Sequence, residues 1–485
     1  MLDLSSLVQA VVAAVMLLAV HRYVNARRPA NSFPYVPSWI PFFGASFHFR
    51  HGPMRVLQAY TVTYGPVFNL TVLGKTITYV TDATLFPPLV KCPALGLFPL
   101  KIKFYERVFG STSHDDPDVF AFLAKHTRQN ILAHLSGTSL AQWTAKSHAL
   151  FQRQVAEGGF GDEFDVSVYA WLAPKVFATL LDTFYGKGLC TPQLAHDFDL
   201  LESKIVALYA GAPATLLKVT EPRQRLHEAL REYIEAHTDT VAPIVGERWD
   251  FCRDKQVDQA AYQLAFVWAM TSNVVRTLFW LLCHLQQYPV AWSAVEGEVR
   301  ACVGAQKGDT PLSESVQTTC PLLDSAVKET LRLRFSGSVL RVAVAQATVD
   351  LPNGTQLRMQ PGDEIMLWGG LGCHDPSRFH NPDDFQFDRF ARYPDLAKDF
   401  RPFGLGKFNC PGQFFAVEFL KVALATLMLD TEISQFEGSA SPNYTTAGVF
   451  APKDAEAVRM CIRRRVFMAD HPTMDEPSNG CVSCA

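Results

Sequence analysis

A single cysteine, Cys410, has the sequence surroundings of a metal-ligating thiolate. It lies in the segment 403–412, which reads FGLGKFNCPG. The glycines Gly404 and Gly406 allow the tight turns with which a loop can lie beneath a flat cofactor. Pro411 suits the first turn of a helix, where free backbone N–H groups favour a thiolate at Cys410. A thiolate in this place can ligate haem iron and favour O–O cleavage.

Two interpretations of this segment compete. In the first, Phe403, Gly404, Gly406 and Gly412 shape a cofactor-binding loop around Cys410. In the second, the cysteine is a small buried hydrophobe, which is the usual environment of a free cysteine. At average residue usage, these five residue types at these offsets should occur by chance in about one chain of this length in ten thousand. The sequence therefore favours the cofactor-binding loop.

The composition indicates a protein with a large core and no nucleic-acid partner. The chain has 485 residues, of which 48% are hydrophobic, and its formal net charge is −3. A chain without excess positive charge lacks the usual attraction for phosphate backbones. The 11 cysteines are odd in number and irregularly spaced, so a disulfide framework is not expected. A reducing, cytosol-facing environment fits better.

The N-terminal segment differs from the rest of the chain. An apolar run over 7–20 is followed by basic residues, whereas a cleaved signal peptide carries its positive charge in front. The positive-inside rule then places the remainder of the chain in the cytosol. We expect a single-pass membrane anchor over 1–24 and a basic, proline-rich hinge over 25–44. The alternative is a cleaved or interfacial segment.

No shift in composition divides the chain after this hinge. We expect one domain over 45–468 and a polar, disordered tail over 469–485. Helical periodicity dominates most of the region from about 115 to 335, and β-strand patterns are confined to short stretches, so the fold class is mainly α with a small β region. The clearest predicted helices are 165–185, 224–238, 256–287 and 321–334. The predicted strands are a hairpin of 67–73 and 76–80, and a β-rich stretch over 339–367.

Three charged residues precede the cysteine loop in a fixed order. Glu329 and Arg332 form an E-x-x-R pair on one helical face, and Arg389 follows after the β-rich stretch. This order, ending in the loop around Cys410, resembles the cytochrome P450 family. The resemblance implies a P450 fold with haem b held by the Cys410 thiolate. It also implies that Glu329, Arg332 and Arg389 form a buried cluster that supports the haem loop.

The predicted helix 256–287 corresponds to the helix where this family activates dioxygen. Most members carry an acid followed by threonine at its middle, to relay protons. Here Ser272 stands at the acid's position and Asn273 at the threonine's. Asparagine can hold a water but cannot act as an acid near neutral pH. Ser272 and Asn273 are the candidate catalytic residues, and protons must follow an ordered-water route or not be needed.

The resemblance also assigns basic residues around the haem. Family members usually place arginine or histidine two residues before the cysteine, where this chain has Phe408. Arg341 matches a propionate-binding arginine of the family, and Lys407 beside the loop can share this role. Lys407 and Lys421 are also candidates for the surface that meets NADPH-cytochrome P450 reductase, although ordinary solvated charge is an equally good interpretation.

The departures at Asn273 and Phe408 occur together in one branch of the family, which holds the sterol hydroxylases of bile-acid synthesis and prostacyclin synthase. The resemblance implies a monooxygenase in the endoplasmic reticulum membrane that hydroxylates a sterol or other lipid with electrons from NADPH. A second reading is an isomerase that rearranges a lipid endoperoxide or hydroperoxide without external electrons. The third is a haem- or lipid-binding protein without turnover.

Overall fold

The structure of the protein is a computed structural model. It describes residues 11–18, 33–38, 44–46, 48–72, 74–112, 117–157, 163–304, 312–398, 400–406, 409–446 and 448–465. Most of the expected anchor and hinge, and the whole polar tail, lie outside these residues. Within the expected anchor, residues 11–18 are helical and expose apolar side chains such as Leu17, which is 69% exposed.

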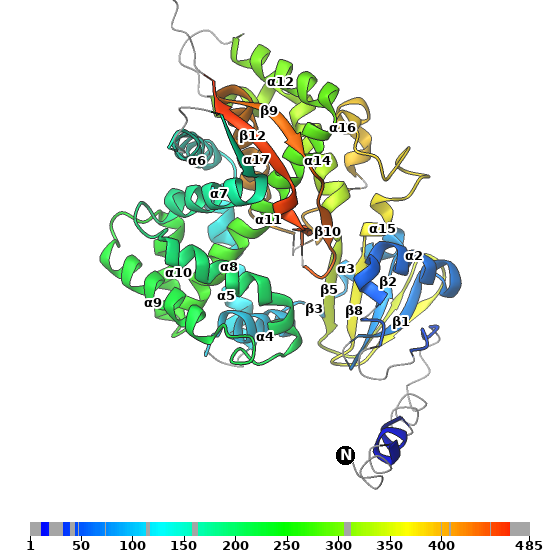
Figure 1. The fold of residues 1–485 in the computed structure, drawn as a ribbon. Helices are drawn as coiled ribbons and strands as arrows, with labels where there is room; N and C mark the ends of the chain where they lie inside the picture. The colour runs from blue at the N-terminus through cyan, green and yellow to red at the C-terminus, as the bar shows by residue number, and fades with distance from the viewer. Residues whose placement is uncertain are drawn as a thin grey trace, which may run out of the picture.

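Helices form most of the molecule (Figure 1). The longest, α11 (Gln259–Gln287), is buried along most of its length. The Asp258 carboxylate caps its N-terminus by accepting a hydrogen bond from the Ala261 N–H at 3.1 Å. The other helices are α2 (Pro53–Tyr64), α3 (Phe86–Lys91), α4 (Phe98–Phe109), α5 (Pro117–Leu135), α6 (Ser139–Ala156), α7 (Val168–Phe184), α8 (Pro192–Ala210), α9 (Thr220–Ala236), α10 (Pro243–Asp254), α12 (Pro289–Gly304), α13 (Leu312–Thr319), α14 (Pro321–Arg334), α15 (Gly370–Cys373), α16 (Arg389–Arg392) and α17 (Gln413–Asp430).

A five-stranded sheet forms the smaller part of the molecule, with β1, β2 and β8 at the lower right of Figure 1. Its order is β1-β2-β8-β5-β3, and only the β2–β8 pair is parallel. Its strands are β1 (Val67–Val72), β2 (Lys75–Val80), β3 (Leu95–Gly96), β5 (Ser338–Ala343) and β8 (Glu364–Trp368). The predicted hairpin and β-rich stretch are therefore confirmed.

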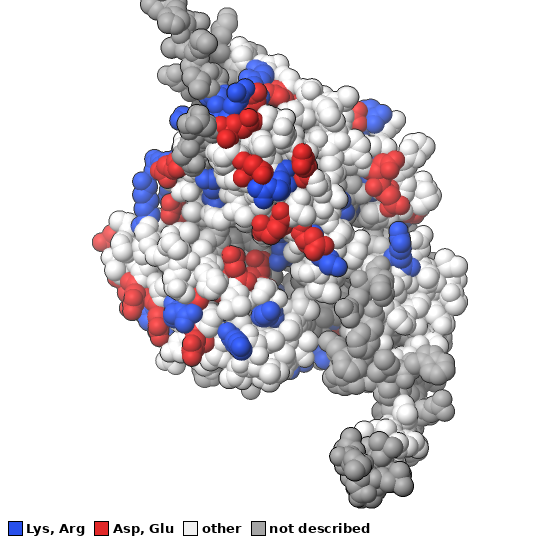
Figure 2. All heavy atoms as spheres, in the orientation of Figure 1, with Lys and Arg blue, Asp and Glu red and all other residues white. Residues whose placement is uncertain are grey.

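Three smaller sheets complete the fold. One has the order β4-β12-β9, and the pairs β6–β7 and β10–β11 form the other two. Their strands are β4 (Phe164–Ser167), β6 (Ala347–Asp350), β7 (Gln356–Met359), β9 (Thr431–Glu437), β10 (Ser441–Asn443), β11 (Ala451–Lys453) and β12 (Arg459–Arg464). On the face of the molecule shown in Figure 2, basic and acidic side chains are interspersed.

The predicted helix 165–185 begins too early. Asp165 lies in β4, where it pairs with Cys461 of β12, and α7 starts only at Val168. Ser167 ends the strand and caps the helix, since its Oγ accepts a hydrogen bond from the Ala170 N–H at 3.4 Å. Pairing with a distant strand decides the conformation of this segment, and local periodicity carries no information about such a partner.

Two long helices are buried on several sides. Among the described residues, α11 alone is long and apolar enough to cross a membrane, and 83% of its apolar window is buried inside the protein. Every residue over 419–428 of α17 is also buried. This burial arises because α6, α11, α12, α13 and α14 all contact α17. A helix that is apolar all round belongs in the core of a large protein.

Candidate active site

The segment around Cys410 forms a tight loop that leads into α17. The backbone N–H of Cys410 donates to Phe403 O at 2.7 Å, which closes the loop on itself. Gly404 and Gly406 have φ angles of 84° and 64°, in the left-handed region that favours glycine. A Cβ at Gly406 would lie 2.6 Å from Val90 Cγ1, so the loop packs closely against α3. The Cys410 side chain is exposed and can accept a ligand.

The thiol of Cys410 lies just before a helix N-terminus. Helix α17 begins at Gln413, and Gly412 is its N-cap residue. Burial by the surrounding protein raises the pKa of the Cys410 thiol, whereas the Gly412 backbone N–H and the Arg128 guanidinium both act to lower this pKa. A coordinated metal ion deprotonates such a thiol outright. Burial is the largest of the three influences, so the pKa of the Cys410 thiol is raised overall, and a bound metal ion would be needed to favour the thiolate.

The structure brings Glu329, Arg332 and Arg389 together in the core. The Glu329 carboxylate accepts hydrogen bonds from Arg332 Nη2 at 2.8 Å and from Arg389 Nε at 3.0 Å, and none of the three side chains is more than 2% exposed. The arginines also bind backbone carbonyls of the loop between α15 and α16. Arg332 donates to Pro382 O at 2.6 Å, and Arg389 donates to His380 O at 2.6 Å. The cluster thus fastens α14 to this loop.

One face of α11 is not covered by neighbouring elements. Ala269 is exposed at the middle of an otherwise buried helix, and Trp268 and Asn273 are half-buried. Ala269 and Asn273 lie four residues apart and therefore share a face. Between them, Ser272 is buried, and its Oγ has no hydrogen-bond partner among the residues that the structure describes. A buried hydroxyl without a partner is uncommon, and this one fits a polar group bound beside the helix.

One basic side chain contacts the cysteine loop, and two others lie near each other on α4 and β5. On α5, Arg128 Nη1 donates to Asn409 O, next to Cys410, at 2.9 Å. Arg341 on β5 is 2% exposed, and burial lowers its pKa to about 10. Burial and the Arg341 charge both lower the pKa of Lys101 on α4. Two neighbouring cations held out of water gain stability from an anion. The two carboxylates of haem b suit them, so these residues fit the cofactor.

The sequence did not single out Arg128 or Lys101. An isolated basic residue on a predicted helix is usually solvated, and neither stands in a motif that sets it apart. The prediction that Lys421 lies on an exposed reductase-binding face is wrong. Lys421 is 3% exposed and pairs with Glu418 at 3.3 Å, because it lies in the part of α17, residues 419–428, that is packed into the core. Lys407 and Phe408 lie outside the described residues.

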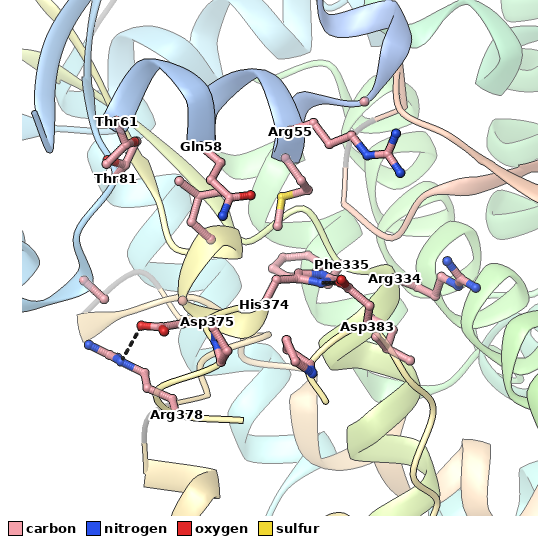
Figure 3. Close-up of a pocket in the computed structure, with 18 of the residues that line it drawn as sticks. Arg55, Gln58, Thr61, Thr81, Arg334, Phe335, His374, Asp375, Arg378 and Asp383 are labelled. Carbon is pink, nitrogen blue, oxygen red and sulfur yellow. Dashed lines mark hydrogen bonds and ion pairs between the residues drawn. The ribbon is translucent and has the colours of Figure 1, made fainter. Parts of the chain in front are cut away.

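A cleft of about 1320 Å³ is shown in Figure 3. It is lined by α2, by the end of α14 and by the loop after α15, and it does not include Cys410, Ser272 or Asn273. His374 and Asp383 interact across it at 2.7 Å. The dashed line in Figure 3 marks the Arg378–Asp375 ion pair, at 3.6 Å. In these two pairs, charged groups that line the cleft compensate one another.

Comparison with known proteins decides the family. Residues 255–456, which include α11, the glutamate–arginine cluster and the cysteine loop, match the family described as Cytochrome P450. Over this part of its length the chain is a cytochrome P450. The match and the monooxygenase names of similar proteins make it a cytochrome P450 monooxygenase, a class that holds haem iron through a cysteine thiolate.

Known P450 enzymes are similar to this chain over most of its length. Mouse cytochrome P450 7B1 is 25% identical over 87% of this chain and 89% of its own length. Hamster (Cricetulus griseus) cholesterol 7-alpha-monooxygenase is 25% identical over 85% of this chain and 88% of its own. Human 7-alpha-hydroxycholest-4-en-3-one 12-alpha-hydroxylase is 26% identical over 84% of this chain and 87% of its own. The similarity of this chain to these enzymes therefore extends well beyond residues 255–456, which match the family model.

Proposed function

We propose that this P450 hydroxylates a sterol or a closely related lipid. The observation that carries the proposal is the similarity, over more than four fifths of the chain, to P450 enzymes whose names describe sterol hydroxylation. The closed loop around Cys410 and the partnerless Ser272 Oγ are consistent with a working oxygen site. At 25–26% identity, the similarity supports the substrate class and not a particular sterol or carbon atom.

In the proposed reaction, the substrate C–H bond and dioxygen are converted to C–OH and one water, with two electrons and two protons consumed. Haem, when bound, supplies the activation of dioxygen. The protein would hold this group through Cys410 and would pair its carboxylates with Arg341 and Lys101, which lie close enough for their charges to interact. Electrons come from NADPH through NADPH-cytochrome P450 reductase, as in membrane-bound members of the family.

Ser272 and Asn273 are proposed to guide the protons. The Ser272 hydroxyl can donate and accept, and its Oγ is buried without a protein partner. Asn273 cannot release a proton, but its amide can hold a water in a fixed place. Together they can order a chain of waters along the uncovered face of α11. The route needs no carboxylic acid at the position of Ser272.

Apolar side chains of α4 and α8 are proposed to bind the lipid. Phe104 of α4 lies with its ring centroid 5.2 Å from that of Trp268 and 5.7 Å from that of Tyr209. Both ring pairs lie beside the uncovered face of α11. Aromatic walls with few polar groups suit a rigid polycyclic ligand. Leu208 of α8 is 1% exposed and packs in the core, whereas Leu216, which follows α8, is 75% exposed.

The proposed location is the endoplasmic reticulum membrane, with the catalytic domain in the cytosol. The exposed apolar helix over 11–18 supports an anchor, since exposed apolar side chains at this density are unfavourable in water. The basic residues after the apolar run support a cytosolic orientation. A sterol substrate would also be concentrated in the membrane.

Isotopic labelling tests the proposed reaction. The purified full chain is supplied with the reductase, NADPH, heavy-isotope dioxygen and a set of sterols, and the product masses are read. We expect a sterol product with one heavy oxygen that forms only when NADPH is present. A parallel sample with lipid hydroperoxides and endoperoxides lacks NADPH. An unlabelled rearranged product in that sample, with no sterol product, would replace the hydroxylase proposal with an isomerase.

A further inference from the structure

An ion pair between α8 and α11 lies one turn from Asn273. Arg276 Nη2 of α11 donates to Glu202 Oε1 of α8 at 2.8 Å, and the two side chains are 8% and 14% exposed. The same guanidinium donates through Nη1 to Val449 O at 3.2 Å. A buried charged pair of this kind is costly to break, because removing one partner leaves the other uncompensated. Arg276 therefore ties α8 and the segment around Val449 to α11.

Val449 also binds Asn273. Its backbone N–H donates to Asn273 Oδ1 at 2.9 Å. A backbone N–H needs an acceptor, so the amide oxygen of Asn273 must face Val449. The preceding residue, Gly448, has φ of 76°, and a Cβ there would lie 2.4 Å from Asn273 Oδ1. Asn273 Oδ1 thus lies close to both Gly448 and Val449. The other polar group of the amide, Nδ2, remains to face a different neighbour.

The other side of this segment is held by the last residue of α14 and by the residues that follow it. Ser336 N donates to Gly448 O at 3.2 Å, and Phe450 N donates to Arg334 O at 2.9 Å. Alternate backbone groups of an extended segment point in opposite directions. Both polar groups of Val449 consequently face α11, where side chains three residues apart, Asn273 and Arg276, bind its N–H and its carbonyl.

We propose that Glu202 and Arg276 are positioning residues for Asn273. The ion pair fixes the Arg276 guanidinium, which holds the Val449 carbonyl, and the Val449 N–H in turn fixes the Asn273 amide with Nδ2 toward the uncovered face of α11. This chain of contacts connects α8, which also packs against α4, to the oxygen site. It rests on the proposed function in one respect, that Asn273 acts in proton delivery.

Three variants separate this role from simple stabilisation. Arg276→Met removes both contacts of the guanidinium and keeps most of the apolar stem. Glu202→Gln removes one charge and keeps the shape. The exchange variant, Glu202→Arg with Arg276→Glu, restores an ion pair between α8 and α11. It cannot restore the bond to Val449 O, because a carboxylate has no hydrogen to donate. Arg225→Met is the control, since Arg225 joins α8 to α9 through Asp197 at 2.6 Å, away from Asn273.

The first readout is hydrogen exchange in the peptide that contains Val449, measured on the full-length holoprotein without turnover. In Arg276→Met and in the exchange variant, we expect the Val449 amide to exchange about tenfold faster, the factor that one net hydrogen bond supplies. Glu202→Gln should give a smaller increase, and Arg225→Met none. The proposal would be overturned if the Val449 amide exchanged hydrogen at the wild-type rate in Arg276→Met. A wild-type rate in the double variant Glu202→Arg with Arg276→Glu would also overturn it.

The second readout is the fraction of NADPH electrons that appear in hydroxylated product. A misplaced Asn273 amide should lower this fraction severalfold in Arg276→Met and in the exchange variant, with the KM for the lipid unchanged. A fall in Arg225→Met of the same size would contradict the positioning role. The two readouts fail separately. If the wild-type protein forms no hydroxylated product, the proposed function fails, while hydrogen exchange still tests how Asn273 is held.

Discussion

Arg389 Nε donates to the Glu329 carboxylate at 3.0 Å although the two residues lie 60 positions apart in the chain. Both side chains are excluded from solvent, with exposed fractions of 2% and 0%. Arg332, on the same helix as Glu329, binds the carboxylate from the other side. One buried carboxylate thus balances two guanidinium groups, and the remaining N–H groups bind backbone carbonyls.

Arg389→Ala should therefore destabilise the protein and prevent haem retention. Removing one member of a buried charged cluster costs about 3–5 kcal/mol in the free energy of unfolding. The loop before α16 would also lose its hydrogen bonds to the Arg389 guanidinium. Chemical denaturation measures the stability, and the ratio of haem to protein absorbance measures retention. Arg332→Ala should behave in the same way.

Arg392→Ala is the matched control for this prediction. Arg392 lies on the same short helix as Arg389, but its side chain is 51% exposed and pairs with Asp388 at 2.8 Å. A surface ion pair contributes about 0–1 kcal/mol. Equal haem loss in the two variants would mean that the buried cluster has no special part in holding the cofactor.

Gly406→Ala should weaken the cysteine loop. The new Cβ would lie 2.6 Å from Val90 Cγ1, and the φ of 64° is unfavourable for alanine. We expect the free energy of unfolding to fall by about 1–3 kcal/mol because of strain at this position. This loss should appear as lower haem content after purification. Adding Val90→Ala removes the clash and leaves the backbone strain, so it should recover only part of the haem. Wild-type haem content in the single variant would show that the loop tolerates the change.

Arg341→Met should speed the loss of haem. The substitution keeps the buried stem but removes the charge that the cofactor's carboxylates are expected to neutralise. A charged hydrogen bond is worth about 1.5–3 kcal/mol, so the dissociation rate should rise about tenfold or more. Transfer of haem to a haem-free acceptor protein measures this rate. Arg358→Met, at an exposed position of β7, should leave it unchanged. An unchanged rate in Arg341→Met would remove this residue from the cofactor site.

Asp199→Asn should stabilise the protein at neutral pH and not at low pH. Burial, and then the neighbouring Glu202, raise the pKa of Asp199 from 3.8 to about 6, while His196 acts to lower it. The folded protein therefore binds this proton more tightly than the unfolded chain. This tighter proton binding stabilises the folded protein. The stabilisation is fully present below about pH 4 and is lost as the pH rises through about 6, because Asp199 then ionises.

Thermal unfolding over a pH series checks this sign. The midpoint of Asp199→Asn should exceed that of the wild type at pH 7.5, and the difference should shrink steadily toward pH 5. Glu202, His196 and Tyr169 lie near this carboxylate and remain in both proteins. A difference that stays constant over the whole range would show that Asp199 does not titrate as described.

Local patterns in the sequence predicted those parts of the site that lie close together in the chain. The three-residue spacing of Glu329 and Arg332 is sufficient to place both on one face of α14, and the bounds of that helix match the prediction. Gly404 and Gly406 have the positive φ angles that a tight loop before Cys410 requires. In each case the relevant geometry is set within one helix or loop.

Contacts between distant segments could not be predicted in this way. The Asn273 amide is held by Val449, 176 residues away, and Lys421 is buried by helices that surround α17 on several sides. The beginning of α7 was displaced for the same reason, since Asp165 pairs with β12. No periodicity within a short window indicates a partner that arrives from elsewhere in the fold.

The central claim is that Cys410 ligates haem iron as a thiolate, and the absorption spectrum of the reduced protein with carbon monoxide tests it most directly. The wild-type protein should give the strongly red-shifted Soret band of a thiolate-ligated haem. Cys410→Ser should lose that band, while Cys461→Ser, at a half-buried cysteine on β12, should keep it. A red-shifted band that survives in Cys410→Ser, or that is absent from haem-loaded wild-type protein, would contradict the account.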